Sequence, residues 1–349
     1  MGAKYELSEE TKVLNEHTLH RIVALKSFGD VSAGEQGGFV ESYANLSQKG
    51  DAWVYDEAAV YGSAVVCDNA KVMGYATVRD TAQISGNSVI RGEAIVSHSA
   101  RVCGHSCISG YAKIFGEAEI RGATVAGEAE VFDTARVSGN AVIKDRAKVF
   151  EQAQVCGCAF VGEEAEVFGN AQICDVAVVR GRALVYDSAQ VFGKAKVESF
   201  SEVYGEAKVY GSAEVEGKAV VFGDAKVYGN AKVYGRAEIF GKSRVYGSAK
   251  VFDTSLVFGS AQIYEQAAVY GCAQISCEAQ IYENARVFAG SKVYTDAHVF
   301  GNSVVEGEAQ VFGKAQISGN AQVMDYAEVF GTAIIDGDMV VDGRQRRFR

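Results

Sequence analysis

The sequence contains no proline in 349 residues, so no segment of it is a proline-rich linker. It also contains no apolar run of about 20 residues, the length that a membrane-spanning helix requires. The first residues, MGAKYELSEETKV, lack the apolar core of a secretory signal. From these absences we expect no membrane as a partner.

Basic charge is scarce as well, because 34 lysines and arginines stand against 44 acidic residues and the net charge is −10. Nucleic acids and anionic membranes are bound mainly by lysine and arginine, so we expect neither as a partner. The eight cysteines form no C-x-x-C pair, which favours reduced thiols and a cytoplasmic protein. No phosphate-binding glycine loop or nucleophile elbow occurs. The Cys103, His105 and Cys107 group lacks the spacing of a known metal site, so we expect no metal.

The chain is instead dominated by a repeat of six residues. Divided from Ala52 onward, it reads AWVYDE, AAVYGS, AVVCDN and so on to Arg344, with one short unit, AEIRG, at residues 118–122. The third residue is Val or Ile in all 49 units, and the first is Ala or Ser in 48 of them. A fixed short period predicts an architecture of stacked units.

Each unit is predicted to form a short strand followed by a corner. The first and third residues are two apart, so both point to one side of a strand while the second and fourth point to the other. Val and Ile at the third position favour extended backbone. Gly, and otherwise often Asp, at the fifth position permits the positive φ of a sharp bend. The chain must therefore wind so that Ala and Val face an axis and the coils stack.

The units around V-Y-G-N-A-K, residues 227–232, resemble the hexapeptide repeat of left-handed β-helix proteins. The resemblance implies an all-β fold, a single-stranded left-handed parallel β-helix of triangular section with three strands per coil. On that basis the 49 units make about 16 coils of about 18 residues. We predict a cap over residues 1–50, the β-helix over residues 51–344 and a basic tail over residues 345–349.

The two ends of the repeat are expected to differ from its middle. Residues 1–50 do not fit the period and are interpreted as a small β cap over the first open edge. The run GGFVESYANLSQKGDAWVY, residues 37–55, resembles a bacterial hexapeptide-repeat subgroup described mostly as acyltransferases or as uncharacterised. The final RQRRFR either pairs with Asp336, Asp338 and Asp342 or binds an acidic partner.

The fourth position of each unit faces solvent in this fold, yet it is Tyr or Phe in 25 of 49 units. Stacked coils sort these rings into columns with a spacing of about 4.8 Å, at which they can stack. One column is the most apolar, because Leu184, Val220 and Leu256 accompany it. Its candidate interface residues are Tyr186, Tyr204, Phe222, Phe240, Phe258, Tyr294, Phe312 and Phe330. Three interpretations are open: stacking that only shields the sheet, a self-association face, and a platform for carbohydrate or another polymer.

Many left-handed β-helix proteins are acyltransferases that use a CoA or carrier-protein thioester, with a histidine as general base at a cleft between two subunits of a trimer. The resemblance therefore makes the five histidines candidates. His98 and His105 lie at successive corners, about one triangle edge apart, and are the catalytic candidates. His298 lies on a strand and points outward, whereas His17 and His20 lie in the cap. No insertion interrupts the repeat, so we expect no loop that closes over an acyl donor.

The favoured hypothesis is a non-catalytic rigid rod that acts as a scaffold or binding element. It would need no cofactor, and it would form a homo-oligomer through its aromatic columns. The first alternative is an acyltransferase that binds acetyl-CoA. The second alternative is a protein that binds carbohydrate or another polymer through its aromatic face.

Overall fold

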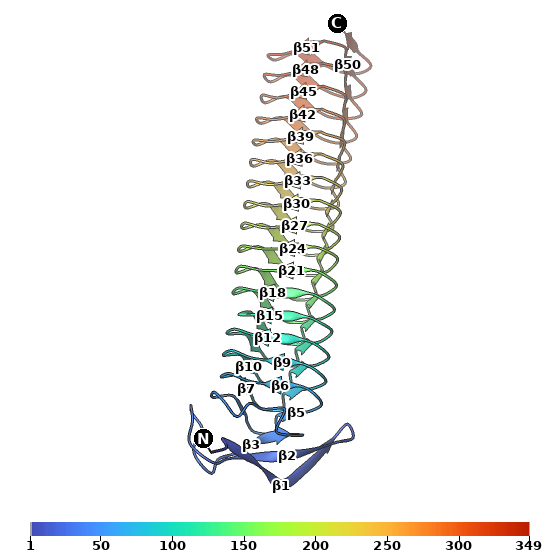
Figure 1. Ribbon diagram of the computed structural model, residues 1–349. Helices are drawn as coiled ribbons and strands as arrows, with labels where there is room; N and C mark the ends of the chain where they lie inside the picture. The colour runs from blue at the N-terminus through green and yellow to red at the C-terminus, as the bar shows by residue number, and fades with distance from the viewer. Residues whose placement is uncertain (1, 349) are drawn as a thin grey trace. The chain divides into compact units, whose positions relative to one another are not determined.

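The computed structural model describes residues 2–348, in which all regular secondary structure is β-strand (Figure 1). These residues contain no helix, and hence none that could cross a membrane. The chain divides into two compact units, residues 1–170 and residues 171–349. Each unit is a parallel β-solenoid with three sheets, which confirms the predicted fold class.

The first unit begins with three longer strands that form the cap (Figure 1). β1 (Tyr5–Leu14) and β2 (His17–Ala24) make an antiparallel hairpin. Both turn residues, 15 and 16, have positive φ, 48° and 69°, the geometry that matches the twist of the flanking strands. β3 (Gln36–Val40) pairs antiparallel with β2 and parallel with β5 (Ala59–Val60). The cap thereby covers an edge of the first coil.

Two buried side chains fasten the cap to the solenoid. Lys4 is 1% exposed and donates from Nζ to the carbonyl oxygen of Ala52 at 2.9 Å. Tyr5 donates its hydroxyl proton to the carbonyl oxygen of Leu46 at 2.8 Å. Burial lowers the pKa of Lys4 to about 8 and raises the pKa of Tyr5. Leu46 itself bridges to Val66 in parallel, as expected of a residue that starts the first coil.

From β4 onward, a strand consists of the second and third residues of each six-residue unit, and a few strands extend to the fourth. We name the sheets in the order in which a coil visits them. In the first unit, sheet 1 comprises β5, β8 (Thr77–Val78), β11 (Ile95–Val96), β14 (Lys113–Ile114), β17 (Glu130–Val131), β20 (Lys148–Val149) and β23 (Glu166–Val167). Sheet 2 comprises β6 (Val65–Val66), β9 (Gln83–Ile84), β12 (Arg101–Cys103), β15 (Glu119–Arg121), β18 (Arg136–Ser138) and β21 (Gln154–Val155). Sheet 3 comprises β4 (Trp53–Val54), β7 (Lys71–Val72), β10 (Val89–Ile90), β13 (Cys107–Ile108), β16 (Thr124–Val125), β19 (Val142–Ile143) and β22 (Phe160–Val161).

The second unit repeats this plan. Its sheet 1 comprises β26 (Leu184–Val185), β29 (Glu202–Val203), β32 (Val220–Val221), β35 (Glu238–Ile239), β38 (Leu256–Val257), β41 (Gln274–Ile275), β44 (Lys292–Val293), β47 (Gln310–Val311), β50 (Glu328–Phe330) and β53 (Arg346–Phe348). Sheet 2 comprises β24 (Gln172–Ile173), β27 (Gln190–Val191), β30 (Lys208–Val209), β33 (Lys226–Val227), β36 (Arg244–Val245), β39 (Gln262–Ile263), β42 (Gln280–Ile281), β45 (His298–Val299), β48 (Gln316–Ile317) and β51 (Ile334–Ile335). Sheet 3 comprises β25 (Val178–Val179), β28 (Lys196–Val197), β31 (Glu214–Val215), β34 (Lys232–Val233), β37 (Lys250–Val251), β40 (Ala268–Val269), β43 (Arg286–Val287), β46 (Val304–Val305), β49 (Gln322–Val323) and β52 (Val340–Val341).

Neighbouring strands of one sheet are 18 residues apart, as where Lys208 pairs with Lys226. Equivalent residues of successive coils therefore lie side by side, which turns the sequence period into columns on the surface. The short unit at residues 118–122 reduces the separation to 17 residues, as between Lys113 and Glu130. The deletion shortens one corner, at Gly122, and leaves strands β15 and β16 paired on both sides.

The core consists of the first and third residues of the units. In the coil from Ala225 to Lys242, for example, Ala225, Val227, Ala231 and Val233 are all fully buried. Where Ser replaces Ala, its hydroxyl finds a partner: Ser243 donates to the carbonyl oxygen of Phe240 at 2.8 Å. The predicted division into inward and outward positions is confirmed.

The corners depend on a fifth residue with positive φ, which is usually Gly. Where it is Asp, the side chain adds a bond to the next coil: the Oδ2 of Asp253 accepts the backbone N–H of Gly271 at 3.0 Å. Asp253 itself has a φ of 60°, a conformation that Asp tolerates better than most residues. Aspartate therefore suits this corner for two reasons, its tolerance of the backbone angle and its carboxylate acceptor.

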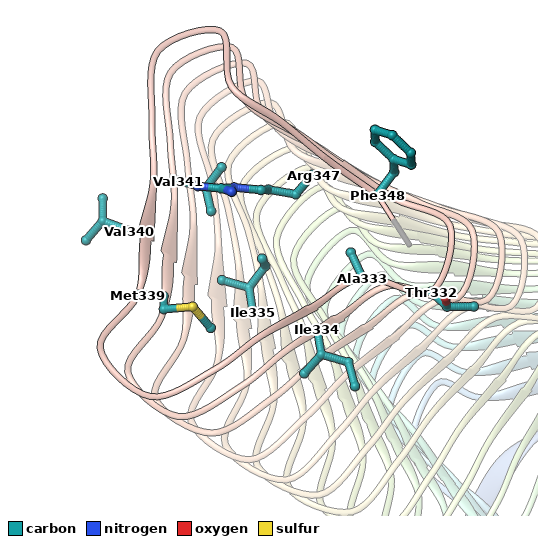
Figure 2. A pocket seen from close by; sticks show the side chains of 9 residues that line it. All are labelled: Thr332, Ala333, Ile334, Ile335, Met339, Val340, Val341, Arg347 and Phe348. Carbon is teal, nitrogen blue, oxygen red and sulfur yellow. The ribbon is translucent and has the colours of Figure 1, made fainter.

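The last described residues continue the coil. Strand β53 pairs with β50 in register, so Arg347 takes the place of an inward Val and Phe348 that of an outward aromatic residue. Figure 2 shows Arg347 directed toward Val341 on the inner side while Phe348 points outward. Arg346 pairs with Glu328 at 2.7 Å. An open cavity here is lined by Thr332, Ala333, Ile334, Ile335, Met339, Val340, Val341, Arg347 and Phe348 (Figure 2).

Candidate functional site

The candidate interface residues form ladders of parallel rings on sheet 1 of the second unit. From Tyr186 to Phe258 the ring centroids of neighbouring rungs are 4.8–5.1 Å apart, with interplanar angles between 4° and 10°. Ser276 interrupts the column, which resumes at Tyr294 and runs through Phe312 and Phe330. Phe348 adds a rung to this second segment, with its centroid 5.6 Å from that of Phe330. The eight candidate residues thus belong to two stacked segments.

The rungs are partly buried by one another, which leaves mainly ring edges at the surface. The inner rungs Phe222 and Phe240 each have a neighbouring ring stacked on both faces. A sugar ring stacks on an aromatic face, and these faces are already occupied. At these inner rungs the geometry therefore disfavours the carbohydrate alternative. It suits a partner that packs against ring edges and the aliphatic side chains beside them.

The environment of the ladder is apolar and lined with carboxylates. Burial, followed by the charge of Glu202, raises the pKa of Tyr186 to about 12. The same two causes, in the same order, raise the pKa of Tyr204. Leu184, Val220 and Leu256 lie partly buried at the outward positions of strands β26, β32 and β38. These strands flank the ladder and enlarge its apolar surface.

The other two sheets of the second unit carry ladders as well. On sheet 2 the stacked rings are Phe192, Tyr210, Tyr228, Tyr246, Tyr264, Tyr282 and Phe300. On sheet 3 they are Tyr234, Phe252, Tyr270 and Phe288. An amide column also runs along one corner, where Asn284 donates to Asn302 and Asn302 donates to Asn320.

The histidines predicted as catalytic candidates lie at two different corners of the first unit. His98, with a φ of 58°, follows a strand of sheet 1, and its Nδ1 lies 3.1 Å from the Oγ of Ser97. His105 follows a strand of sheet 2, and its Nε2 lies 3.1 Å from the side-chain nitrogen of Asn87. Each imidazole is thus held by polar neighbours of its own corner, and the two do not form one site. Their catalytic role stays a prediction.

Two other histidines also have defined surroundings. In the cap, the Nδ1 of His20 lies 3.2 Å from the carbonyl oxygen of Ser8. On sheet 2, His298 approaches Tyr282 edge-on, and its Nε2 lies 3.7 Å from a carboxylate oxygen of Asp296. Within residues 2–348, no group of three or more His, Cys, Asp or Glu side chains could hold a metal ion.

His17 in the cap, which no sequence pattern marks as a catalytic candidate, has the most organised surroundings of the histidines. Its Nδ1 lies 2.9 Å from Oε1 of Glu41, and its ring packs against Tyr61 at 4.9 Å between centroids. The other oxygen of Glu41 accepts the backbone N–H of Gly62 at 2.7 Å, which fixes the carboxylate. Pairing with His17 lowers the pKa of Glu41. A carboxylate on Nδ1 orients an imidazole and leaves Nε2 available as a base.

No sequence pattern predicts this pair, because Glu41 lies 24 residues after His17. The two side chains come together only when β3 pairs with β2. His17 is 40% exposed at its side chain, so a small acceptor molecule could reach it from solvent. The arrangement can accept a proton, and it has a built-in counter-charge for the resulting imidazolium.

Comparison with known proteins bears on the acyl-transfer alternative. The chain is similar to an Escherichia coli (strain K12) protein described as the uncharacterized acetyltransferase YdcK, with 35% identity over 65 residues. The matched part is 16% of this chain and 20% of the length of that relative. No protein-family model matches the chain. The six-residue repeat, the three-sheet solenoid and this partial similarity fit a hexapeptide-repeat family.

Proposed function

We propose that the protein is a scaffold or binding element that associates through the aromatic ladder on sheet 1 of its second unit. One observation carries this proposal. The ladder and the aliphatic residues beside it, Leu184, Val220 and Leu256, form a continuous outward strip of partly buried apolar side chains. Contiguous exposed apolar surface on a soluble protein usually marks a contact site.

The proposal is tested by measuring molar mass by light scattering after gel filtration, over a wide range of concentration. Wild-type protein is expected to show a mass above that of one chain, and this mass should rise with concentration. A variant in which Phe222, Phe240 and Phe258 are all replaced by Glu is expected to stay monomeric. Unchanged oligomer mass in this variant contradicts the proposed interface.

Two further variants keep this test informative. Because glutamates in the ladder also weaken the fold, the second variant replaces Leu184, Val220 and Leu256 with Ser and leaves every ring in place. The matched control replaces Phe252 and Phe288 with Glu in the ladder of sheet 3. Circular dichroism checks that all variants are folded. Loss of mass in the control as well contradicts a specific role for sheet 1.

A second candidate function is acetyl transfer from acetyl-CoA, supported by the description of the partly matching relative and by the His17–Glu41 pair. In this mechanism Nε2 of His17 removes the proton from an acceptor hydroxyl or amine. At the same time the acceptor's oxygen or nitrogen attacks the thioester carbonyl. The tetrahedral intermediate then collapses, the carbon–sulfur bond breaks, and the thiolate of CoA leaves and takes up a proton. Glu41 stabilises the charged imidazole.

Calorimetric titration with acetyl-CoA tests this second candidate before any acceptor is known. Measurable binding supports acyl transfer, and absence of heat at millimolar acetyl-CoA contradicts it. If the protein binds, hydrolysis or transfer of the acetyl group is compared between wild type and single variants. His17→Gln is expected to abolish it, whereas His98→Ala and His105→Ala are expected to retain it. The opposite pattern would return the catalytic role to the corner histidines.

A further inference from the structure

Sheet 2 of the second unit carries a row of like charges. Lys208, Lys226 and Arg244 occupy the outward positions of β30, β33 and β36 and lie directly opposite one another in register. Among residues 2–348, none of the three forms an ion pair. Like charges opposite each other on neighbouring strands destabilise a sheet. The row is therefore unfavourable in the isolated chain.

On sheet 3 of the same coils an acidic residue relieves part of this repulsion, although Lys232 and Lys250 also lie opposite each other in register. There Glu214 lies between two lysines, with its carboxylate 3.2 Å from Nζ of Lys196 and 2.5 Å from Nζ of Lys232. In the first unit, Glu119 likewise lies between Arg101 and Arg136. Alternation of charge across strands is thus available to this fold, and sheet 2 lacks it between β30 and β36.

Sheet 1 of the same coils has the complementary pattern. Glu202 and Glu238 occupy the outward positions of β29 and β35, with Val220 between them on β32. Within the described residues neither glutamate forms an ion pair, and Glu202 only accepts a long hydrogen bond of 3.4 Å from Tyr186. The ladder of sheet 1 is therefore bordered by two uncompensated carboxylates.

The two patterns match in spacing as well as in sign. Glu202 and Glu238 are two coils apart on sheet 1, and Lys208 and Arg244 are two coils apart on sheet 2, which is about 9.6 Å in each case. When the two faces meet, each glutamate can lie against a cation. The stem of Lys226 then lies opposite Val220.

We infer that sheet 1 of one copy of this chain docks on sheet 2 of a second copy, and that the row of cations is the recognition element for the glutamates. This inference rests on the proposed self-association through the sheet 1 ladder and names the surface that receives it. A contact between two copies of sheet 1 would bring four unpaired glutamates together, which electrostatics disfavours. The contact therefore joins two different faces, so in a dimer one copy keeps a free sheet 2 and the other copy keeps a free sheet 1.

Such a contact produces a closed cyclic oligomer when the rotation from one copy to the next returns to the first copy. Otherwise it produces an open filament. It is also modest in size. Five coils at about 4.8 Å make a strip roughly 24 Å long, and four extended residues make it about 13 Å wide. The area of such a strip is well below the ~800 Å² per partner of a standard interface. We therefore expect association in the micromolar range or weaker, with a marked dependence on salt.

Charge reversal tests the inference. One variant carries Glu202→Lys and Glu238→Lys, and a second carries Lys208→Glu and Arg244→Glu. Alone, each variant presents two faces of the same sign and is expected to stay monomeric by light scattering at low salt. An equimolar mixture is expected to recover the wild-type mass, because opposite faces again meet. The matched control, Lys250→Glu with Arg286→Glu, reverses two exposed cations on sheet 3 at the same spacing of two coils and should associate like wild type.

The outcomes separate this inference from the proposed function. If wild-type protein remains monomeric at all concentrations, the proposed self-association is wrong and the inference fails with it. If wild type associates and both charge-reversal variants associate equally well, the ladder interface stands and the docking of sheet 1 on sheet 2 is overturned. Recovery of association in the mixture, with none in the separate variants, supports the inference.

Discussion

The gap in the aromatic ladder at Ser276 permits a direct test of what the stacked rings contribute to stability. Ser276 occupies an aromatic position on sheet 1, and the rungs on either side are Phe258 and Tyr294. Elsewhere in this column consecutive rungs are 4.8–5.1 Å apart. Two coil steps, about 9.6 Å, therefore leave room for one ring between Phe258 and Tyr294. The change Ser276→Phe is expected to join the two segments.

The size of the effect follows from the two ring pairs that this substitution creates. A phenylalanine at position 276 would stack on two rings, and each such pair contributes about 0.5–1.5 kcal/mol beyond the area that it buries. Ordering the new side chain opposes this gain by roughly 0.5–1 kcal/mol. We expect a net stabilisation of about 1 kcal/mol, within the range of roughly 0–2.5 kcal/mol that these values span. For a cooperative unit of this size, each kcal/mol raises the midpoint of thermal unfolding by about 2–4 °C.

The assay is urea unfolding followed by far-ultraviolet circular dichroism, with thermal unfolding as a second measure. Ser276→Leu is the control, because it adds apolar area without a ring. The Phe258→Ala change is then combined with Ser276→Phe in a double-mutant cycle, which isolates the coupling between the two rings. The reasoning is refuted if Ser276→Phe stabilises no more than Ser276→Leu, or if the cycle gives no coupling energy.

Three further predictions concern the corners, the tyrosines and the cap. Replacing Asp253 with Ala is expected to lower the free energy of unfolding by about 2 kcal/mol in urea, because Ala tolerates the positive φ poorly and the bond to Gly271 is lost. Asp253→Gly loses only the bond and should destabilise about half as much, and Asp253→Asn should destabilise least. The pKa of Tyr186, raised by burial and then by Glu202 to about 12, should fall in Glu202→Gln when tyrosine ionisation is followed by carbon NMR. Because the pKa of Tyr186 is higher in the folded state, the folded chain still binds this proton at pH values where the unfolded chain has lost it. The contribution of Tyr186 to the free energy of unfolding is therefore complete below pH 10.0 and is lost as the pH rises through 12. Burial lowers the pKa of Lys4 from 10.5 to about 8, so the unfolded chain binds more protons between these values, and wild-type stability should rise with pH in this window. The Lys4→Met variant, compared by urea unfolding, should lack this rise, and equal slopes for both proteins would contradict the assignment.

The periodic part of the fold could be predicted because each coil repeats one simple requirement. The third residue of a unit must be β-branched and apolar, the first must be small, and the fifth must accept positive φ, and these preferences are visible in single residues. The same period accounts for the amide column from Asn284 to Asn320, since residues 18 apart become neighbours.

Other features could not be predicted because they depend on contacts that the period does not describe. The sequence predicts a basic tail over residues 345–349, in which Gln345 and Arg347 stand where Ala and Val are the rule, and its residues Arg346–Phe348 form β53. Its backbone pairs with β50 all the same, because ladder hydrogen bonds are indifferent to the side chain. The His17–Glu41 pair likewise arises only from the docking of the cap strands.

The coil spacing that lets the aromatic rings stack also forces the cations on sheet 2 close together, which indicates that this row has a partner. In a solenoid, any outward residue is placed about 4.8 Å from its equivalents in the next coils, whether the pair attracts or repels. For aromatic rings this spacing is favourable, whereas two exposed unit charges at this distance repel by on the order of 0.5 kcal/mol after screening. This repulsion occurs at two successive pairs on sheet 2, Lys208 with Lys226 and Lys226 with Arg244. On sheet 3, Glu214 shows that a single acidic residue between two cations replaces the repulsion with ion pairs. The penalty of such a row falls when carboxylates from another surface approach it, and Glu202 and Glu238 on a different sheet present two outward carboxylates at the matching spacing.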